Sequence, residues 1–140
     1  MVKTFGLTHI ALAVRDAERA FRFYADVFGV VAVYREPGFL QAQTPGSRDV
    51  LVFEERRRLA RGSGGIAHFG FRLVDPAEID AAAEAVVRAG GTITSRGEFC
   101  PGEPYVFFTD PDGYEVEIWH ELPTSVDPPI HDRPPSRARS

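Results

Sequence analysis

Several features that mark well-known classes of protein are missing from this 140-residue sequence. It has a single cysteine, Cys100, so no disulfide bond can form within the chain, and a reducing cytoplasm is the expected location. It has no apolar run long enough to span a membrane, and its first residues lack the hydrophobic segment of a secretory signal. Positive charge is not in excess, because 16 Lys and Arg stand against 20 Asp and Glu. The net charge of −4 gives no broad attraction to nucleic acid.

The sequence does contain an internal repeat, which is the main guide to its fold. The stretch T-H-I-A-L-A-V-R-D at 8–16 matches A-H-F-G-F-R-L-V-D at 67–75 and pairs His9 with His68. Later, P-G-S-R-D-V-L-V-F-E-E at 45–55 matches P-D-G-Y-E-V-E-I-W-H-E at 111–121. In each copy a strand pattern is followed by a helical pattern, with Asp16 and Asp75 as the expected N-terminal caps, and then by shorter strands. The repeat predicts an α+β fold made of two βαβββ modules.

The limits of the two copies define the expected domain organisation. One domain is expected over residues 1–122, with module one at about 5–55 and module two at about 66–122. The later strands are expected at 30–34, 39–43 and 49–54 in the first module, and at 92–95, 105–109 and 114–120 in the second. Residues 123–140 contain five prolines and little apolar content, so a disordered tail is expected.

Strand alternation places three side chains that commonly bind metals on comparable faces of the two modules. His9 shares its face with Ala11, and His68 shares its face with Gly70, so both histidines have a small neighbour on their strand. Glu117 lies on the last strand of module two, on the side of that strand opposite its aliphatic residues. If the modules pair about a pseudo-twofold axis, the two imidazoles and this carboxylate would face one cavity.

Such a group suits a divalent transition metal. Neutral imidazole nitrogen and carboxylate oxygen are ligands that Fe²⁺, Mn²⁺, Ni²⁺, Zn²⁺ and Co²⁺ accept, and three protein ligands leave positions open for water or substrate. A bound ion would also offset the cost of turning Glu117 away from water. Each residue taken alone is as well explained by an ordinary core or surface role. His120 and His131 have no repeat-related support, because His120 has the wrong parity and His131 lies in the tail.

Three stretches of the chain resemble the vicinal oxygen chelate superfamily, the family of glyoxalase, bleomycin resistance protein and extradiol dioxygenase. They are H-I-A-L-A-V-R-D followed by F-Y-A-D-V-F-G-V, then G-G-I-A-H-F-G-F-R-L, and then F-F-T-D-P-D-G-Y-E-V-E-I-W. The resemblance implies that the paired βαβββ modules form a cup-shaped open barrel around one metal held by His9, His68 and Glu117. It also implies a small-molecule substrate bound through two neighbouring oxygens, and a homodimer. Pairing of the modules within one chain or across two chains stays open.

The sequence differs from some members of this family. Glyoxalase I has a further carboxylate ligand on the last strand of its first module, where this sequence has Leu51, or Val52 if the register shifts by one. Extradiol dioxygenases use two histidines and one glutamate, which matches here and favours Fe²⁺. They also place a tyrosine on the preceding strand. Spacing gives Phe107 at that position, and Tyr105 on the same face is the candidate catalytic residue.

The first functional interpretation is therefore a ring-cleaving dioxygenase of the extradiol type. The second is a glyoxalase-like lyase or isomerase. An alternative from another class is a resistance protein that sequesters a hydrophobic compound, and a further one is a scaffold with an idle site. The resemblance and the charge balance together predict neither a nucleic-acid partner nor a membrane partner.

The same strand faces predict the lining of a substrate pocket. Each aromatic side chain taken singly is as well explained by core packing, but the set predicts an aromatic pocket with few polar groups and a flat or hydrophobic substrate. The candidates are Phe39, Gln41, Phe53, Tyr105, Phe107 and Trp119, with Arg72 as the one cation.

Overall fold

Each module begins with a strand that leads into a helix, as the repeat predicts. A computed structural model of the chain describes residues 1–3, 5–60 and 62–128. In module one, β1 (Ile10–Val14) leads into α1 (Ala17–Phe28). The side chain of Asp16 caps the start of this helix by accepting a hydrogen bond from the N–H of Arg19, and Gly29 ends the helix with a φ of 70°. In module two, β5 (Phe69–Arg72) leads into the 3₁₀ helix η1 (Pro76–Glu78) and then α2 (Ile79–Arg88).

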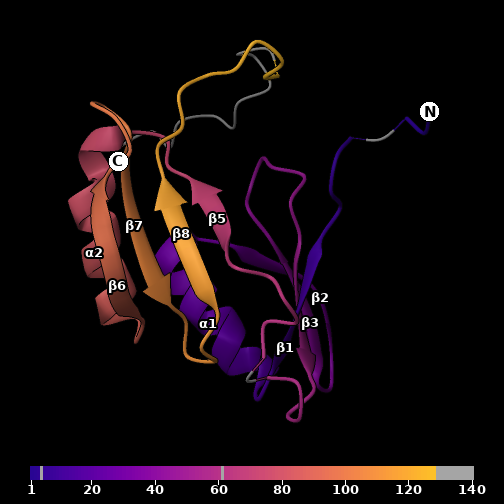
Figure 1. Cartoon of the computed structure of the whole chain (residues 1–140). Coiled ribbons are helices and arrows are strands. Elements are labelled where there is room, and N and C mark those ends of the chain that lie inside the picture. The colour runs from indigo at the N-terminus through magenta and orange to yellow at the C-terminus, as the bar shows by residue number, and fades with distance from the viewer. Residues whose placement is uncertain (4, 61, 129–140) are drawn as a thin grey trace, which may run out of the picture.

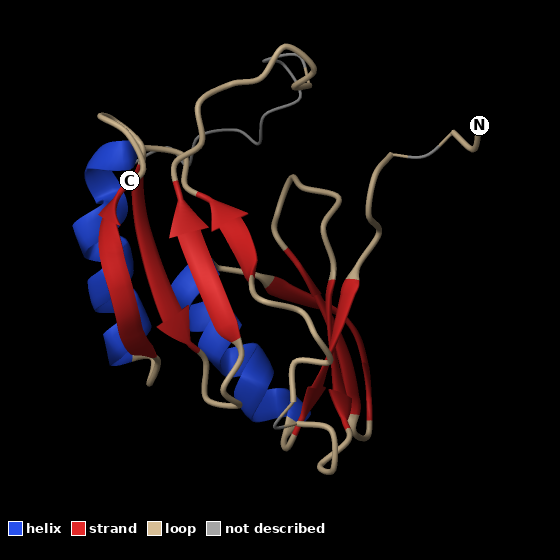
Figure 2. Cartoon of the chain, viewed as in Figure 1, coloured by secondary structure: helices blue, strands red, loops and turns tan. Residues whose placement is uncertain are grey.

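Two four-stranded sheets with the same topology are found among the described residues (Figures 1 and 2). The first has the order β1-β4-β3-β2, with β2 at Val31–Glu36, β3 at Phe39–Gln43 and β4 at Leu51–Glu55. The second has the order β5-β8-β7-β6, with β6 at Thr92–Glu98, β7 at Pro104–Thr109 and β8 at Glu115–Trp119. In each sheet the first strand pairs in parallel with the last, and the other pairs are antiparallel. The expected α+β architecture of two βαβββ modules is confirmed.

The two modules share one hydrophobic core, into which each sheet turns one face. Leu12 and Val14 of β1 are buried there, and so are Val116 and Ile118 of β8. Helix α1 lies between the sheets, where its Phe28 ring stacks on a phenylalanine of β5 with ring centroids 3.8 Å apart. The opposite face of each sheet, called the outer face below, carries the alternate side chains, as strand parity predicts.

The strand register corrects one part of the repeat alignment. Ala11 lies opposite Val52 in sheet one, and Gly70 lies opposite Glu117 in sheet two, so the repeat partner of Glu117 is Val52 rather than Leu51. The error arose because module one has one more residue than module two between the turn proline and this equivalent position, from Pro45 to Val52 and from Pro111 to Glu117. The corrected register also places Phe53 in the core, where it is fully buried, so it does not line a pocket on the outer face.

The D-P-D-G turn at 110–113 makes hydrogen bonds between the two modules. The Oδ1 atom of Asp112 accepts hydrogen bonds from the backbone N–H and Nε of Arg15 and from Nη2 of Arg19, at 3.1–3.3 Å. The hydroxyl of Tyr24 donates to Asp110. The motif that introduces β8 therefore also fixes module two against the β1–α1 segment of module one.

The remaining segments lie at the chain ends. Among residues 123–128, Thr124 and Asp127 form a hydrogen-bonded turn, and the part of the expected disordered tail at 129–140, with His131, lies outside the described residues. No helix in the described part of the chain has the length and hydrophobicity needed to cross a membrane.

Candidate metal and substrate site

The outer face of sheet two brings two of the three predicted ligands together. Nε2 of His68 lies 3.2 Å from Oε2 of Glu117. Glu117 is 7% exposed, and its Oε1 is buried with no hydrogen-bond partner among the described residues. Burial raises the pKa of this carboxyl group, and the nearby His68 opposes the rise. A buried carboxylate oxygen without a partner, next to an imidazole, is suited to bind a cation.

A glycine makes the space beside Glu117. Gly70 on β5 pairs with Glu117 on β8, and a Cβ at Gly70 would lie 3.2 Å from the backbone oxygen of Glu117 and 3.4 Å from its Cβ. A larger residue would therefore push against the carboxylate-bearing strand. The small neighbour that the sequence places next to His68 thus opens the surface around the His68–Glu117 pair.

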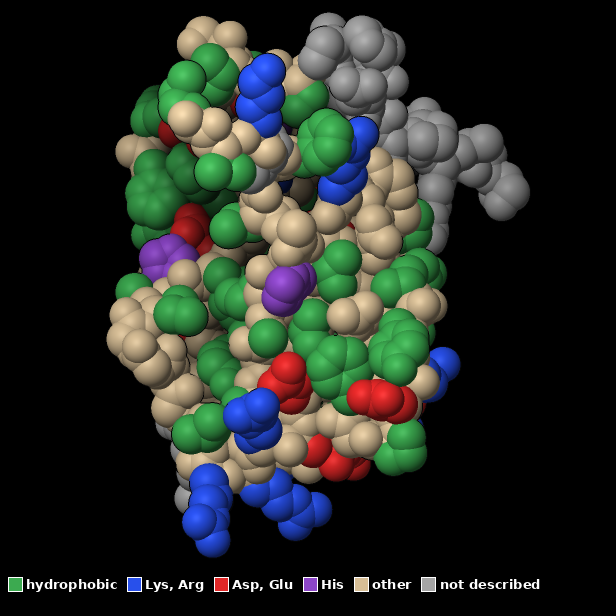
Figure 3. All heavy atoms as spheres, turned by 90° about the vertical axis from the view of Figure 1, so that its right-hand side faces the viewer, with side chains coloured by type: hydrophobic (Ala, Val, Ile, Leu, Met, Phe, Trp, Pro, Cys, Tyr) green, Lys and Arg blue, Asp and Glu red, His purple; other side chains and the backbone are tan. Residues whose placement is uncertain are grey.

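His9 is not part of this group within one chain. It is exposed, it precedes β1, and its Nδ1 lies 2.6 Å from the hydroxyl oxygen of Thr8. Among the residues that the structure describes, no three His, Cys, Asp or Glu side chains lie close enough to hold one metal ion. Figure 3 shows one face of the molecule, where histidine side chains stand at separate places and one of them, at the left edge, lies against an acidic side chain. A single chain therefore assembles two of the three predicted ligands.

Four aromatic side chains continue the site from the His68–Glu117 pair, and we call them the aromatic wall. The Phe107 ring lies edge-on to His68 at 4.9 Å between centroids and 5.6 Å from Tyr105. Phe99 stacks on Tyr105 at 4.2 Å and meets Trp119 edge-on at 5.5 Å. Phe99 was missed by sequence reasoning, because it lies in a turn after β6 where no strand periodicity indicates its direction.

The hydroxyl of Tyr105 points away from the metal-ligand candidates. It would lie 2.9 Å from a Cβ on Gly97 of β6, the strand that borders β7 on the side opposite β8. In this position Tyr105 contributes its ring to the aromatic wall. Its predicted catalytic role has no contact with Glu117 to support it in a single chain.

A pocket of about 330 Å³ lies at the β5–β8 end of this outer face. At its far end, Arg72 donates to Glu121 at 2.8 Å and to Asp127 at 3.4 Å. The hydrogen bond to Glu121 raises the pKa of the guanidinium group, so this cation is already neutralised by carboxylates. The indole Nε1 of Trp119 is buried without a hydrogen-bond partner among the described residues. The lining residues are His68, Phe69, Gly70, Phe71, Arg72, Glu117, Trp119 and Glu121.

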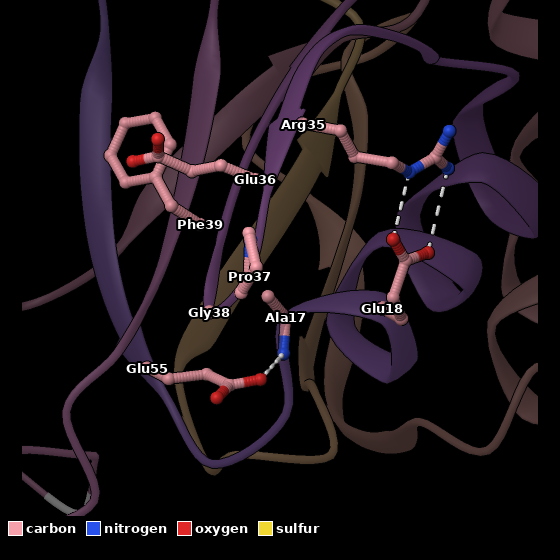
Figure 4. Close-up of a pocket in the computed structure, with 8 residues that line it drawn as sticks. All are labelled: Ala17, Glu18, Arg35, Glu36, Pro37, Gly38, Phe39 and Glu55. Carbon is pink, nitrogen blue, oxygen red and sulfur yellow. Dashed lines mark hydrogen bonds and ion pairs between the residues drawn. The ribbon is translucent and has the colours of Figure 1, made fainter.

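The pocket candidates in module one lie on the other sheet. Gln41 pairs with Val52 on the outer face of sheet one, and Phe39 lies near the Tyr34 ring at 6.0 Å. A second hollow next to Phe39 is shown in Figure 4. There Glu55 accepts a hydrogen bond from the N–H of Ala17 at 3.1 Å, and the side chains of Arg35 and Glu18 form an ion pair. The charged groups of this second hollow thus already have partners.

His120 and Cys100 make local contacts outside this site. The Nδ1 atom of His120 lies 3.1 Å from the carbonyl oxygen of Leu73, and Cys100 donates to Glu103 in an exposed turn. Hydrogen bonding to Glu103 raises the pKa of the Cys100 thiol, which opposes thiolate formation. Neither residue contacts the His68–Glu117 pair.

Known proteins resemble this chain in sequence and in fold. Residues 6–118 match the family model of the Glyoxalase/Bleomycin resistance protein/Dioxygenase superfamily. The chain is 28% identical over 126 residues to the catechol-2,3-dioxygenase of Bacillus subtilis, and the match covers 85% of this chain but only 44% of that protein. It is 32% identical over 127 residues to an uncharacterised protein of Pseudomonas aeruginosa, with 84% and 89% covered.

A solved structure shares the fold. The lactoylglutathione lyase from Agrobacterium tumefaciens superposes with a TM-score of 0.66 at 23% identity, which covers 84% of this chain and 94% of that one. At this level of identity the likeness concerns the fold alone.

Proposed function

Because the chain belongs to the Glyoxalase/Bleomycin resistance protein/Dioxygenase superfamily, as its motifs predict, we propose that it is a divalent-metal-dependent enzyme. It would bind a small organic substrate through two neighbouring oxygens. The observation that carries this proposal is the buried Oε1 of Glu117, which lacks a partner among the described residues although His68 approaches the other oxygen. A cation at this position would satisfy that oxygen and lower the cost of burying the charge.

The third ligand in this proposal is His9 of the partner subunit. The outer face of sheet two carries His68 and Glu117, and the outer face of sheet one carries His9, while both core faces are used within the chain. In a twofold dimer that joins these two outer faces, each chain completes the other's site. The proposed assembly is therefore a homodimer, and the lone cysteine is consistent with a cytoplasmic location.

Within this scheme the residues have distinct roles. The metal would act as a Lewis acid that stabilises negative charge on the substrate oxygens. Glu117 and His68 would hold it at one end of the pocket, where the Phe107 ring lies edge-on to His68. The aromatic wall provides a surface on which a flat ring can stack.

Ring-cleaving dioxygenase chemistry on Fe²⁺ is the reaction that we favour over a glyoxalase-like lyase or isomerase. Val52 occupies the position equivalent to Glu117 in module one, and it can neither bind a metal nor accept a proton. A two-histidine, one-carboxylate site leaves three positions open, enough for a chelating substrate and dioxygen. The similarity to a catechol-2,3-dioxygenase supports this choice, although the match covers less than half of that protein.

Mixing two variants tests the shared site. His9→Ala and His68→Ala homodimers should each lose stoichiometric metal, because each variant lacks one ligand in both sites. A dimer with one chain of each kind has one intact site, so random mixing after mild denaturation should restore about a quarter of the wild-type metal content. Metal that returns on mixing supports the shared site. Metal retained in both variants would refute ligation by these histidines, and metal lost without recovery would refute the sharing of the site.

The metal and the reaction are tested next. Protein purified anaerobically without an affinity tag is analysed for metal, reconstituted with Fe²⁺, and supplied with catechols while oxygen uptake is recorded. Uptake that requires Fe²⁺ and is absent in Glu117→Ala supports the dioxygenase. Turnover of hemithioacetals with Ni²⁺ or Zn²⁺ and no oxygen uptake supports the lyase. Tight ligand binding that survives both a chelator and His68→Ala would instead indicate a sequestering protein.

A further inference from the structure

The indole N–H of Trp119 is a buried donor that the metal site does not use. Its Nε1 has no hydrogen-bond partner among the described residues, although Trp119 lines the same pocket as Glu117. Buried polar groups are nearly always hydrogen-bonded, because an unmade bond costs free energy in the interior. We propose that Trp119 donates this hydrogen bond to a third oxygen of the substrate, at the end of the molecule opposite its two metal-binding oxygens. This inference rests on the proposed function.

The spacing along β8 sets the length of such a substrate. Glu117 and Trp119 lie on the same face, two residues apart, which separates their backbone positions by about 6.6 Å. Gly70 pairs with Glu117 and contributes no side chain, so the pocket floor beside the carboxylate is open. A benzene ring that carries vicinal hydroxyls at one end and an acceptor at the other has this length. The geometry therefore favours a catechol with an acceptor para to one hydroxyl over an unsubstituted catechol.

The charges around the indole favour a neutral acceptor. Arg72 lies next to Trp119 at the far end of the pocket, but it is engaged by both Glu121 and Asp127. Two carboxylates against one guanidinium leave this end with negative charge. A substrate carboxylate would be repelled there, whereas a carbonyl or amide oxygen would accept the indole hydrogen without adding charge.

Phe99 is an aromatic neighbour of the indole that a ligand could displace. The Phe99 ring meets Trp119 edge-on, and Phe99 is 55% exposed. Because so much of this side chain is already in water, its rotation away from the indole gives up little buried area. The ring of a ligand could take its place against Trp119 and keep the aromatic contact.

Two ligands of nearly the same shape test the proposal. 3,4-Dihydroxyacetophenone has a carbonyl oxygen para to one hydroxyl, and 4-ethylcatechol has the same skeleton without that oxygen. Affinities of the Mn²⁺-loaded dimer and the chelator-treated dimer are measured by anaerobic titration calorimetry. Trp119 is the only tryptophan in the chain, so its fluorescence, corrected for absorption by the ligand, gives a second signal of binding near this residue. The wild-type protein should bind the acetophenone about tenfold more tightly than 4-ethylcatechol.

The variant Trp119→Phe keeps an aromatic ring but removes the donor. Changes in packing act on both ligands and cancel in the ratio of their affinities, so the ratio should fall to about one if the indole N–H makes the bond. 3,4-Dihydroxybenzoate should bind more weakly than the acetophenone to the wild-type protein. Equal affinities in the wild type, an unchanged ratio in Trp119→Phe, or no binding of the acetophenone would each overturn the proposal.

Failure of the metal site gives a different result. If binding is unaffected by chelation and by His68→Ala, the proposed metal chemistry is wrong, and the ratio in Trp119→Phe still decides the role of the indole. If binding requires the metal but the ratio of the two ligand affinities is the same in Trp119→Phe as in the wild type, the metal site is supported and the role of the indole is refuted.

Discussion

The hydroxyl of Tyr24 donates a 2.7 Å hydrogen bond to Oδ2 of Asp110 and thereby connects α1 of module one to the turn before β8 in module two. Asp110 is 5% exposed, and its Oδ1 accepts the N–H groups of Asp112 and Tyr114. Burial raises the pKa of Asp110 above its ordinary value, and the hydrogen bond from Tyr24 opposes that rise. The turn that leads to Glu117 is therefore held by the Asp110 side chain, whose burial disfavours its ionised form.

The variant Tyr24→Phe should make stability more dependent on pH. Since the folded-state pKa of Asp110 is raised, the folded protein binds this proton more tightly than the unfolded chain, and the free energy of unfolding falls as pH rises through that pKa. Loss of the Tyr24 hydrogen bond removes an opposing effect and raises the pKa further. We expect a cost of about 1–3 kcal/mol at pH 7 and a smaller cost near pH 4.

Urea denaturation of Tyr24→Phe and the wild type between pH 4 and pH 8 provides the measurement. Tyr34→Phe is a matched control, because its exposed hydroxyl donates to Glu36 at 3.1 Å and its loss should cost less than about 0.5 kcal/mol. A cost of Tyr24→Phe that stays constant across this range would show that Asp110 does not titrate as described.

Asp112→Ala should be the most damaging change at the module boundary. Its side chain is 1% exposed and pairs with both Arg15 and Arg19, so its removal leaves two guanidinium groups facing a partly buried site without a counter-ion. We expect a loss of about 3 kcal/mol. The control is Glu18→Ala, which removes the exposed pair with Arg35 and should cost no more than about 1 kcal/mol. Similar losses in chemical denaturation of the two variants would contradict a special role for the Asp112 cluster.

Much of this architecture could be read from the sequence. Alternation correctly separated core residues such as Val116 from Glu117, because one face of β8 must be buried and period-two patterns record that requirement. The helix caps at Asp16 and Asp75 could also be predicted, because an aspartate before a helix commonly accepts hydrogen bonds from nearby backbone N–H groups, as both do here.

Other features depend on contacts that no local pattern records. The repeat alignment was based on the turn residues and so missed the extra residue before β4. As a result Leu51 was aligned with Glu117 in place of Val52, and Phe53 was assigned to the wrong face of the strand. The arginine partners of the Asp112 side chain lie 93 or more positions away in the chain. The separation of His9 from the His68–Glu117 pair depends on how the modules pack together, which strand parity does not determine.

Gly70→Ala tests whether space beside Glu117 matters for metal binding. The new Cβ would press on the backbone and Cβ of Glu117 while every proposed ligand remains present. We expect affinity for Zn²⁺ or Mn²⁺ to fall about tenfold, as happens when the support of a ligand is disturbed. Gly62→Ala is the control, because its Cβ would meet only a backbone oxygen at 4.0 Å. Calorimetric titration of both variants gives the answer, and equal affinities would show that the Gly70 gap has no part in the site.

Val52→Glu tests both the corrected register and the shared site. Val52 is 3% exposed, so a carboxylate there should destabilise the metal-free protein by about 2 kcal/mol or more. It pairs with Ala11, two residues from His9 on the same outer face, and in the proposed dimer it would point toward the metal as a fourth ligand. Added Zn²⁺ or Ni²⁺ should therefore raise the melting temperature of Val52→Glu by more than that of the wild type.

Leu51→Glu is the matched variant in the adjacent register position. Leu51 belongs to the hydrophobic core, so its carboxylate would face buried side chains and no metal. We expect Leu51→Glu to be destabilised at least as much as Val52→Glu and to gain nothing extra from metal. Thermal unfolding with and without metal distinguishes the two variants. Stabilisation of Leu51→Glu by metal, or no stabilisation of Val52→Glu, would contradict the proposal that the Val52 side of β4 faces the metal. It would also contradict the proposed pairing of outer faces across the dimer.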